Sequence, residues 1–358
     1  MCRKEQTIVW LLAAAVLLTV GFFGCNRVKN AEPDRGGKYK IALSNSYMGN
    51  DWRQNMIRVT ELAMSKSPYK EKVDLTIVNT ENSPEAQSAS IDAMIKQGYD
   101  AIVIDCASPR GLNPVIDRAV NAGITVVTFD QIADNQNCYG IESDWAYLSE
   151  IIGKFMVEVL SGRGNVVMDR GLPGAPVSAM FYDGVMKVFK QYPNIKVVAE
   201  FDGMYSEGPS EQGVAAAITA NSQIDAVFTQ GYVNSIVRAF KNANRPIPCI
   251  TGNNYQSTVR AAIEDRFPVL MYSADLVGFG AMAIQVAIDI LEGNPPPEKH
   301  MVIKDAIFYS LTTEVGDKIG VTIKNIEDVY FPDVPPSFMW PVLPDDFPVQ
   351  ITKDELLQ

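Results

Sequence analysis

Two halves of the chain repeat the same order of strand and helix patterns, and this repetition limits the fold more than any other feature. In the first half, "YDAIVIDC" predicts a buried strand, "NPVIDRAVNAG" a helix that opens on Pro and stops at Gly, and "TVVTF" the next strand. In the second half, "IDAVFTQ", "IVRAFKNAN" and "IPCITGNN" follow in the same order, with Asp225 matching Asp100 and Asn253 matching Asp130. The strands "YKIALS" and "VDLTIVN" are likewise matched by "GNVVMD" and "IKVVAEF". Four matches in one order indicate two similar α/β units.

Strands that alternate with helices of this length predict parallel sheets covered on both faces. We therefore expect an α/β fold of two similar doubly wound parallel-sheet lobes joined by a hinge, and 358 residues are enough for both. The first lobe is expected over 38–140 with a returning segment at about 254–276, and the second over 141–253 with about 277–330. Residues 331–358 are rich in Pro and aromatic residues and predict an extended arm packed on the domain, or alternatively a segment that binds a partner.

Charge and composition exclude several classes of function. The net charge of −11 argues against a nucleic-acid binder, which needs a basic face to neutralise phosphates. The chain has one histidine, His300, which excludes a multi-histidine metal site and leaves no partner for a catalytic triad. The turn "GLPG" has neither the GxGxxG pattern nor the P-loop lysine. We therefore expect no metal and no cofactor.

The five cysteines follow no metal-binding or redox motif. Cys2 and Cys25 lie near the start of the chain, and Cys106, Cys138 and Cys249 are spread through its body without a CxxC pair. Free buried thiols are expected for these last three, with a Cys106–Cys138 disulfide as the alternative.

The first residues have the pattern of a secretory signal. A basic start is followed by an apolar run from Ile8 to Phe23, and Gly24 precedes Cys25. A short membrane-spanning anchor is the alternative. The junction resembles a bacterial lipoprotein signal, although Phe22 departs from that pattern. The resemblance implies a signal peptide over 1–25 with Cys25 lipidated, a flexible tether over 26–37, and an extracytoplasmic protein anchored by lipid to the cytoplasmic membrane.

Asp130 lies where the strand "TVVTF" ends. In open parallel sheets, ligands bind beyond the carboxyl ends of the strands, so we expect Asp130 in a cleft between the lobes. Asp105 ends the preceding strand and is a second candidate for that edge. A capping role in the loop that follows is the structural alternative for Asp130.

From Lys38 to about Tyr330 the chain resembles the type I periplasmic sugar-binding proteins of ABC transporters, the ribose- and galactose-binding group. The resemblance rests on an ordered set of segments: "IALSNSYMGNDWRQNM", "IDAMIKQGYDAIVIDCASPRGLNPVIDRAVNAGITVVTFDQ", "GLPGAPVSAMFYDGV", "IDAVFTQGYVNSIVRAF", "CITGNN" and "EGNPPP". In that family, Asp130 corresponds to a carboxylate that accepts hydrogen bonds from two adjacent sugar hydroxyls, and Trp52 is the best candidate for an apolar platform under the ring. The resemblance implies the ligand-binding residues Asn50, Trp52, Arg53, Asp105, Asp130, Gln131, Phe181, Tyr205, Gln230, Tyr232, Asn253 and Tyr272.

Four of these positions depart from the family pattern. Gln131 and Phe181 stand where many members have Arg, and Tyr232 and Asn253 stand where many have Asp. Arg and carboxylate groups grip sugar hydroxyls in forked geometry, so their loss predicts a more aromatic, less charged pocket. A deoxy sugar, a polyol, an inositol-like compound or another small neutral molecule then fits as well as ribose or glucose.

The resemblance implies a non-enzymatic, monomeric binding protein that delivers a small neutral sugar or polyol to the membrane subunits of an ABC permease. A ligand-sensing subunit that signals to a membrane receptor or kinase is the main alternative. A hydrolase using Asp105 and Asp130 is a third class, which the absence of a His or Cys constellation disfavours. A transcription regulator is a fourth, but the secretory segment occupies the place of its DNA-binding helices.

Overall fold

The computed structural model describes residues 37–273, 277–303, 306–344 and 346–358. The predicted signal segment, Cys25 and the predicted tether up to Gly36 therefore lie outside the described residues. Within the described ranges, none of the helices has the length and apolar character that a membrane crossing requires.

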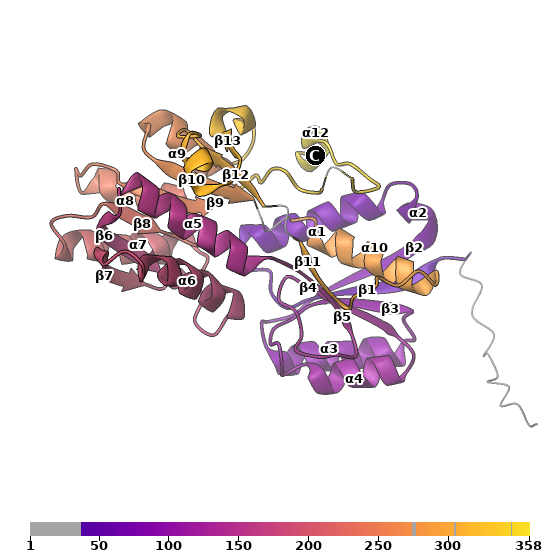
Figure 1. Cartoon of the computed structure of the whole chain (residues 1–358). Helices are drawn as coiled ribbons and strands as arrows, with labels where there is room; N and C mark the ends of the chain where they lie inside the picture. Colours follow the sequence, from indigo (N-terminus) through magenta and orange to yellow (C-terminus); the bar gives the residue numbers. More distant parts are fainter. Residues whose placement is uncertain (1–36, 274–276, 304–305, 345) are drawn as a thin grey trace, which may run out of the picture. The chain divides into compact units, whose positions relative to one another are not determined.

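The first lobe is built on a six-stranded, wholly parallel sheet with the strand order β11-β5-β4-β3-β1-β2. Its strands are β1 (Tyr39–Asn45), β2 (Val73–Asn79), β3 (Ala101–Asp105), β4 (Thr125–Phe129), β5 (Tyr139–Ser143) and β11 (His300–Ile303). The helices α1 (Asp51–Met64), α2 (Tyr69–Lys72) and α10 (Phe279–Leu291) share one apolar core with the sheet, and α3 (Pro84–Lys96) and α4 (Asn113–Asn121) share the core on its other face (Figure 1).

Alternation along β1 explains how one strand serves two cores. Ile41 and Leu43 are buried with α1 and α10, whereas Ala42 is buried with α3 and α4. Successive side chains of a strand point to opposite faces, so a strand covered on both sides is apolar throughout. Local signals in the sequence set the helix bounds. The Ser83 hydroxyl, for example, accepts the N–H of Ala86 at the start of α3.

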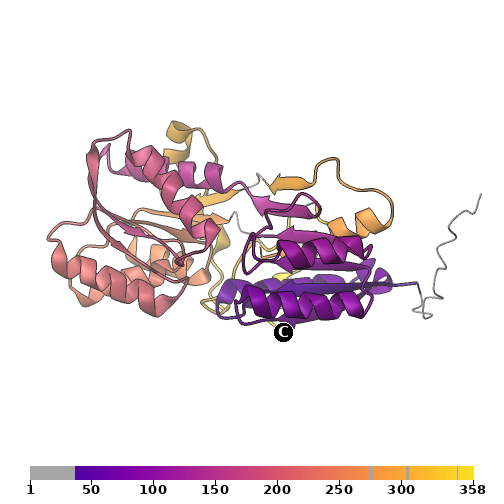
Figure 2. The same cartoon turned by 90° about the horizontal axis from the view of Figure 1, so that it is seen from below.

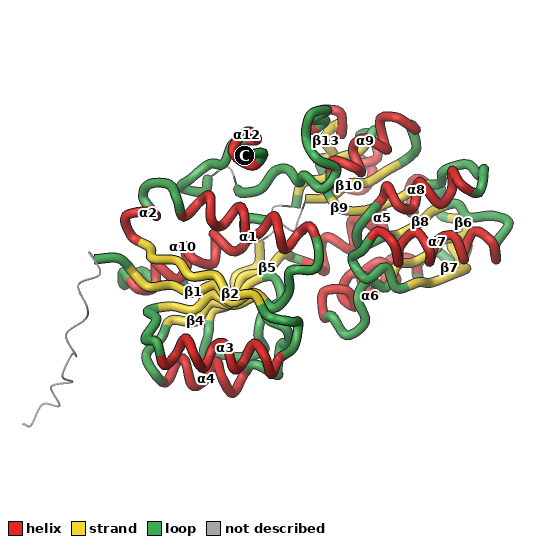
Figure 3. Tube along the Cα trace, turned by 180° about the vertical axis from the view of Figure 1, so that it is seen from behind, coloured by secondary structure: helices red, strands yellow, loops and turns green. Residues whose placement is uncertain are grey.

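The second lobe repeats this arrangement around a seven-stranded sheet with the order β13-β12-β10-β9-β8-β6-β7, in which only β10 and β12 pair antiparallel. Helices cover both faces of each sheet (Figures 2 and 3). On one face of the second sheet are α5 (Trp145–Val159), α6 (Pro176–Phe189) and α11 (Val315–Ile319), and on the other are α7 (Glu207–Ala220), α8 (Val233–Asn242), α9 (Gln256–Asp265) and the short 3-10 helix η1 (Ile326–Val329). The strands are β6 (Arg163–Asp169), β7 (Asn194–Phe201), β8 (Ala226–Phe228), β9 (Cys249–Asn253), β10 (Val269–Ser273), β12 (Ile307–Ser310) and β13 (Ile323–Asn325). The expected fold class is confirmed.

The predicted points at which the chain passes between the lobes are wrong. Strand β10, placed by the prediction in a returning segment at 254–276, pairs with β9 of the second sheet from Val269↔Ile250 onward. The segment that returns to the first lobe is α10 with β11, and β12 and β13 belong to the second lobe. The first lobe also extends past residue 140, to the end of β5 at Ser143. Buried apolar strands fit either sheet by pattern alone, so only the tertiary pairing distinguishes these assignments.

The last described segment packs against elements of both lobes. Val342, Leu343 and Phe347 are buried in the core that contains α1 and α10. Met339 pairs with Tyr255 beside α9 in a short antiparallel bridge. A four-residue helix, α12 (Lys353–Leu356), lies near the end of the chain.

Candidate functional site

A cavity of about 340 Å³ lies beyond the carboxyl ends of strands from both sheets. This volume falls in the range of small-molecule sites. We call it the cleft. It is lined by Tyr47, Asn50, Trp52, Arg53, Asn82, Asp130 and Gln131 of the first lobe and by Leu172, Val177, Phe181, Met204, Tyr205, Ser206, Pro209, Gln230, Gly231, Tyr232, Asn253 and Tyr255 of the second.

A buried guanidinium lies between two carboxylates on the first-lobe side. Arg53 is 4% exposed, forms an ion pair with Asp105 and donates from Nη1 to Oδ1 of Asn45 at 2.8 Å. Its Nη2 lies 3.6 Å from Oδ2 of Asp130, a looser contact. Burial raises the pKa of Asp130 to about 6, and the positive charge of Arg53 partly opposes this shift. Asp130 is therefore a carboxylate whose ionisation depends on its surroundings near neutral pH.

The cleft is lined by unusual backbone conformations. Asp130, Met204 and Tyr205 have φ angles of 56°, 56° and 47°, in the left-handed region that side chains other than Gly rarely adopt. Each such residue costs of order 1 kcal/mol or more and is maintained by its surroundings. Left-handed residues on both sides of one cavity are typical of a binding site.

Aromatic rings form much of the cleft wall. Tyr232 and Tyr255 stack with centroids 4.8 Å apart and planes 5° from parallel. The Tyr232 hydroxyl donates to Asp51 at 3.1 Å, which links the N-cap residue of α8 in the second lobe to α1 in the first. Phe181 packs against Tyr272 at a centroid distance of 5.7 Å. The wall is therefore a layered aromatic surface.

Asp169, at the end of β6, organises the second-lobe side. Its carboxylate accepts the backbone N–H groups of Gly171 (2.7 Å), Gly203 (2.8 Å) and Gln230 (3.2 Å) and the hydroxyl of Thr229 (3.0 Å). Burial raises the pKa of Asp169, and these hydrogen bonds oppose the shift. One carboxylate thus fixes three of the loops that carry cleft residues of this lobe.

A small polar network extends from this anchor to the cleft. The hydroxyl of Tyr205 donates to Oε1 of Gln230 at 3.1 Å and lies 2.6 Å from Oγ of Ser178. The amide of Gln230 donates to the carbonyl of Ser178 at 3.1 Å. Tyr205 and Gln230 are therefore held in place before a ligand arrives.

The structure brings together all of the predicted site residues except Asp105 and Tyr272. Asp105 is fully buried behind Arg53, and Tyr272 is 1% exposed behind Phe181, so both support cleft residues from beneath. The remaining predicted residues, Asn50, Trp52, Arg53, Asp130, Gln131, Phe181, Tyr205, Gln230, Tyr232 and Asn253, line the cavity.

The sequence reasoning missed several lining residues. Tyr47 lies inside the first loop already singled out, and Tyr255 lies two residues after Asn253, so proximity to those motifs is the signal that would have found them. Asn82, with a φ of 48°, had a weaker signal in the turn "ENSP". Met204 and Ser206 carry no signal in the sequence alone.

The thiols and acidic groups do not suggest other chemistry. Cys106, Cys138 and Cys249 are buried and free, so the alternative of a Cys106–Cys138 disulfide is not what the structure has. Burial raises the pKa of Cys138 to about 11 and that of Cys249 to about 12, which keeps both protonated. Across the described ranges, no group of three or more His, Cys, Asp or Glu side chains is placed to hold a metal ion.

Two doubly wound lobes with a small-molecule cleft beyond their strand ends define the class of two-lobed binding proteins. Residues 41–295 match the family described as periplasmic binding protein domain, and the chain belongs to this family. It is therefore an extracytoplasmic solute-binding protein rather than a member of an enzyme family.

Individual relatives support the assignment. The chain is 23% identical over 292 residues to the ribose import binding protein RbsB of Bacillus subtilis, which covers 78% of this chain and 93% of the relative. It is 25% identical over 265 residues to the xylitol-binding protein of Mycolicibacterium smegmatis, with 71% and 72% covered. The crystal structure of an ABC transporter solute binding protein from Thermobispora bispora superposes with a TM-score of 0.67 at 30% identity, covering 75% of this chain and 84% of that one.

Proposed function

We propose that the protein captures a small neutral polyhydroxylated ligand, a monosaccharide or a related polyol, in the cleft and delivers it to an ABC importer. The observation that carries this proposal is Asp130, a cleft carboxylate whose contact with Arg53 is a long 3.6 Å. Such a carboxylate retains acceptor capacity for hydroxyl donors. The names of the relatives, which specify ribose and xylitol, support the same ligand class.

The cleft offers the two kinds of contact that a polyhydroxylated ligand needs. An ionised acceptor contributes about 1.5–3 kcal/mol per hydrogen bond, and a micromolar complex requires about −8 kcal/mol in total. The amides of Asn50, Gln131 and Asn253 add donors and acceptors to the lining of the cleft. The rings of Trp52, Tyr232 and Tyr255 supply apolar surface for the C–H face of a ring or chain.

The mechanism is a population shift between arrangements of the two lobes. A ligand that contacts residues of both lobes can make all of its contacts only when the lobes are closed around it. It therefore binds the closed arrangement more tightly than the open one and shifts the population toward it. The cleft draws its lining from both lobes, and the Tyr232–Asp51 hydrogen bond already connects them. We expect a monomer to suffice, because a single chain supplies the whole lining.

The proposal includes attachment to the cytoplasmic membrane through a lipid on Cys25, with residues 26–37 as the tether and the ABC permease as the partner. Growth of the producing cells with labelled palmitate should label the wild-type protein. The Cys25→Ala variant should remain unlabelled and leave the membrane fraction. Labelling that survives the substitution would contradict the proposed lipid anchor on Cys25.

A ligand-sensing role would use the same cleft as transport. Unchanged ligand uptake in cells that lack the protein would favour sensing over transport.

The binding test is calorimetric titration with a panel of pentoses, hexoses, deoxy sugars, pentitols and inositols. We expect one compound or a small related group to bind with 1:1 stoichiometry, and Asp130→Ala to weaken that binding strongly. Asp92→Ala is the matched control, because Asp92 pairs with Arg118 on the surface and lines no part of the cleft. Absence of binding across the panel, or binding that Asp130→Ala leaves unchanged, would contradict the proposal.

A further inference from the structure

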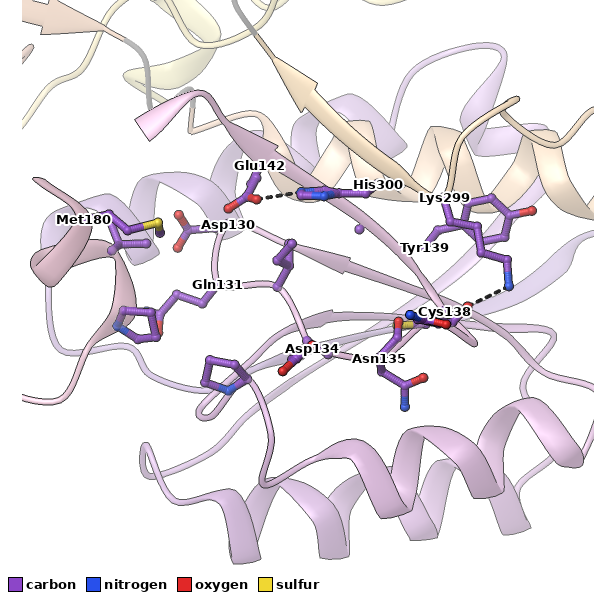
Figure 4. A pocket seen from close by; sticks show the side chains of 17 residues that line it. Asp130, Gln131, Asp134, Asn135, Cys138, Tyr139, Glu142, Met180, Lys299 and His300 are labelled. Carbon is purple, nitrogen blue, oxygen red and sulfur yellow. Dashed lines mark hydrogen bonds and ion pairs between the residues drawn. The ribbon is translucent and has the colours of Figure 1, made fainter. Parts of the chain in front are cut away.

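A second cavity, of about 520 Å³, adjoins the cleft. Asp130, Gln131 and Val177 line both cavities, so the two meet at these residues. We call the second cavity the side chamber. In Figure 4, Asp130, Gln131 and Met180 lie at one end of it, and Lys299 and Cys138 lie toward the other.

One wall of the side chamber is the loop 131–138, which hydrogen bonds hold against α4. The side chain of Asn113 donates to the carbonyl of Asp134 at 2.8 Å. Asn135 and Asn137 both donate to Oδ1 of Asp117, at 3.0 and 2.8 Å. These bonds attach the loop to the helix at three points, so the side chamber is formed without an occupant.

Several polar groups of the side chamber already have partners within the protein. Lys299 donates to the carbonyl of Gln136 at 3.0 Å and lies over the ring of Tyr139, 5.6 Å from its centroid. His300 Nε2 lies 2.6 Å from Oε1 of Glu142 across β11 and β5 (Figure 4).

The surface that remains for an occupant is therefore mostly apolar, from Ile132, Tyr139, Val177 and Met180. Gly140 extends this space, because it contributes no side chain to the lining.

The cleft and the side chamber differ in what they offer. The cleft presents a carboxylate and several amides, which suit hydroxyl groups, whereas the side chamber presents an apolar surface joined to it at Asp130 and Gln131. A ligand that matches both has a polyhydroxylated part and an apolar part directly attached. We infer that the protein binds a glycoside, whose sugar ring lies in the cleft and whose apolar aglycone extends past Gln131 into the side chamber. This inference rests on the proposed function, because it requires the sugar ring to bind in the cleft.

The test compares free sugars with their aryl glycosides by calorimetry on the full chain. D-Galactose, D-xylose, D-glucose and L-fucose are each titrated beside their phenyl α- and β-glycosides. Burial of the phenyl ring is expected to tighten binding at least about tenfold for one anomer of the preferred sugar. Gly140→Val places a side chain in the lining of the side chamber, where a Cβ would lie 3.4 Å from Oγ1 of Thr128 and 3.5 Å from Ile132. It should remove the preference for the phenyl glycoside while leaving the free sugar's affinity unchanged.

Met180→Ala provides a second variant that does not depend on the fold tolerating a side chain at residue 140. Met180 is 39% exposed and lines the side chamber but not the cleft, so its truncation should reduce the preference about threefold. Tyr147→Ala is the matched control, because Tyr147 is 38% exposed on the same lobe and lines neither cavity.

The outcomes separate the two proposals. A preference for the phenyl glycoside that both chamber variants reduce and Tyr147→Ala preserves supports the inference. Binding of a free sugar without a preference, or with a preference that neither chamber variant changes, overturns the inference and leaves the proposed function standing. Absence of binding by every free sugar and every glycoside overturns the inference. The proposed function fails with it only if the pentitols and inositols of the calorimetric panel also do not bind.

Discussion

Asp130 in the first lobe and Asp169 in the second are buried carboxylates at the carboxyl ends of β4 and β6, yet their surroundings differ. Asp169 accepts four hydrogen bonds, three from backbone N–H groups and one from a hydroxyl. Asp130 has a guanidinium at 3.6 Å, and Arg53 is also engaged by Asp105. The position of a carboxylate at a strand end therefore does not determine its role. The role depends on how many hydrogen-bond donors the neighbouring loops supply. A carboxylate with few such donors retains acceptor capacity for a ligand.

The largest expected effect on stability comes from Arg53, the cation that lies beside the buried carboxylates of the first lobe. Asp169 in the second lobe is held by hydrogen bonds instead. Arg53→Leu leaves Asp105 and Asp130 buried without their positive partner, and breaking a buried pair in this way costs about 3–5 kcal/mol of the free energy of unfolding. Urea denaturation measures the loss. Arg118→Leu, which breaks an ion pair on the surface, should cost far less. Equal losses in the two variants would show that the buried cation does not stabilise the first lobe.

The second-lobe anchor should come next. Asp169→Ala removes the acceptor from four donors at once, and we expect a loss of about 3 kcal/mol in the free energy of unfolding. Asp130→Asn should be neutral or stabilising at pH 7.5, because it removes a buried charge that has few donors. A denaturation series on both variants tests the contrast directly, and a larger loss from Asp130→Asn than from Asp169→Ala would reverse it.

For ligand affinity we expect the opposite order to that for stability, with Asp130 more important than Asp169. Asp130→Ala is expected to weaken binding of the preferred sugar or polyol about 100-fold, the equivalent of two hydrogen bonds to a charged acceptor. Titration calorimetry at pH 7.5 provides the measurement. A variant that binds within threefold of wild type would mean that the ligand does not use this carboxylate.

Titration of Asp130 should make affinity depend on pH. Its pKa in the unliganded protein is raised to about 6, and hydroxyl donors favour the ionised form. Affinity should therefore be full above pH 7 and fall as the pH drops through 6, by at most about tenfold per pH unit. Asp130→Asn should bind weakly at every pH, and a pH dependence that persists in this variant would assign the titration to another group.

Stability should respond to the same titration with the opposite sign. Asp130 in the folded protein holds its proton up to about pH 6, above the usual range for Asp. Between about pH 4 and pH 6 the folded state therefore binds more protons than the unfolded state, and the contribution of Asp130 to the free energy of unfolding falls as pH rises.

The smallest effect concerns the link between the lobes. Tyr232→Phe keeps the ring that stacks on Tyr255 but removes the hydroxyl that donates to Asp51. We expect a loss of about 1.5 kcal/mol in the free energy of unfolding, the low end of the range for a charged acceptor, because Asp51 is only half-buried. Thermal denaturation without ligand measures it. A loss as large as that of Asp169→Ala would contradict the rank of this hydroxyl as the smallest effect.

The fold class was predictable because the repeated strand and helix patterns are local and because caps such as Ser83 and Pro84 mark helix starts. The points at which the chain crosses from one lobe to the other were not predictable. Strand β10 and helix α10 are both apolar, and which sheet each one joins depends on pairing with strands far away in the sequence.

In the site, Asp130, Trp52 and Asn253 were predictable from strand ends and quoted motifs. Met204 and Ser206 were not, because they reach the cleft through a loop whose conformation depends on the hydrogen bond from Gly203 to Asp169. The supporting positions of Asp105 and Tyr272 were also beyond the sequence, since a strand pattern indicates burial but not which residue stands between a side chain and the cavity.

The contact of residues 338–340 with residues 254–256 supports one wall of the cleft from behind. Tyr255, a cleft residue, pairs with Met339, and the backbone N–H of Gln256 donates to the carbonyl of Phe338 at 2.9 Å. The side chain of Asn254 donates to the carbonyl of Trp340 at 3.2 Å. The described strands of both sheets end before residue 330, so a variant shortened at that point would keep these strands but lack the backing of this wall. The shape of the cleft therefore depends on a segment that adds no strand to either sheet, and a substitution there can alter ligand affinity from outside the cavity.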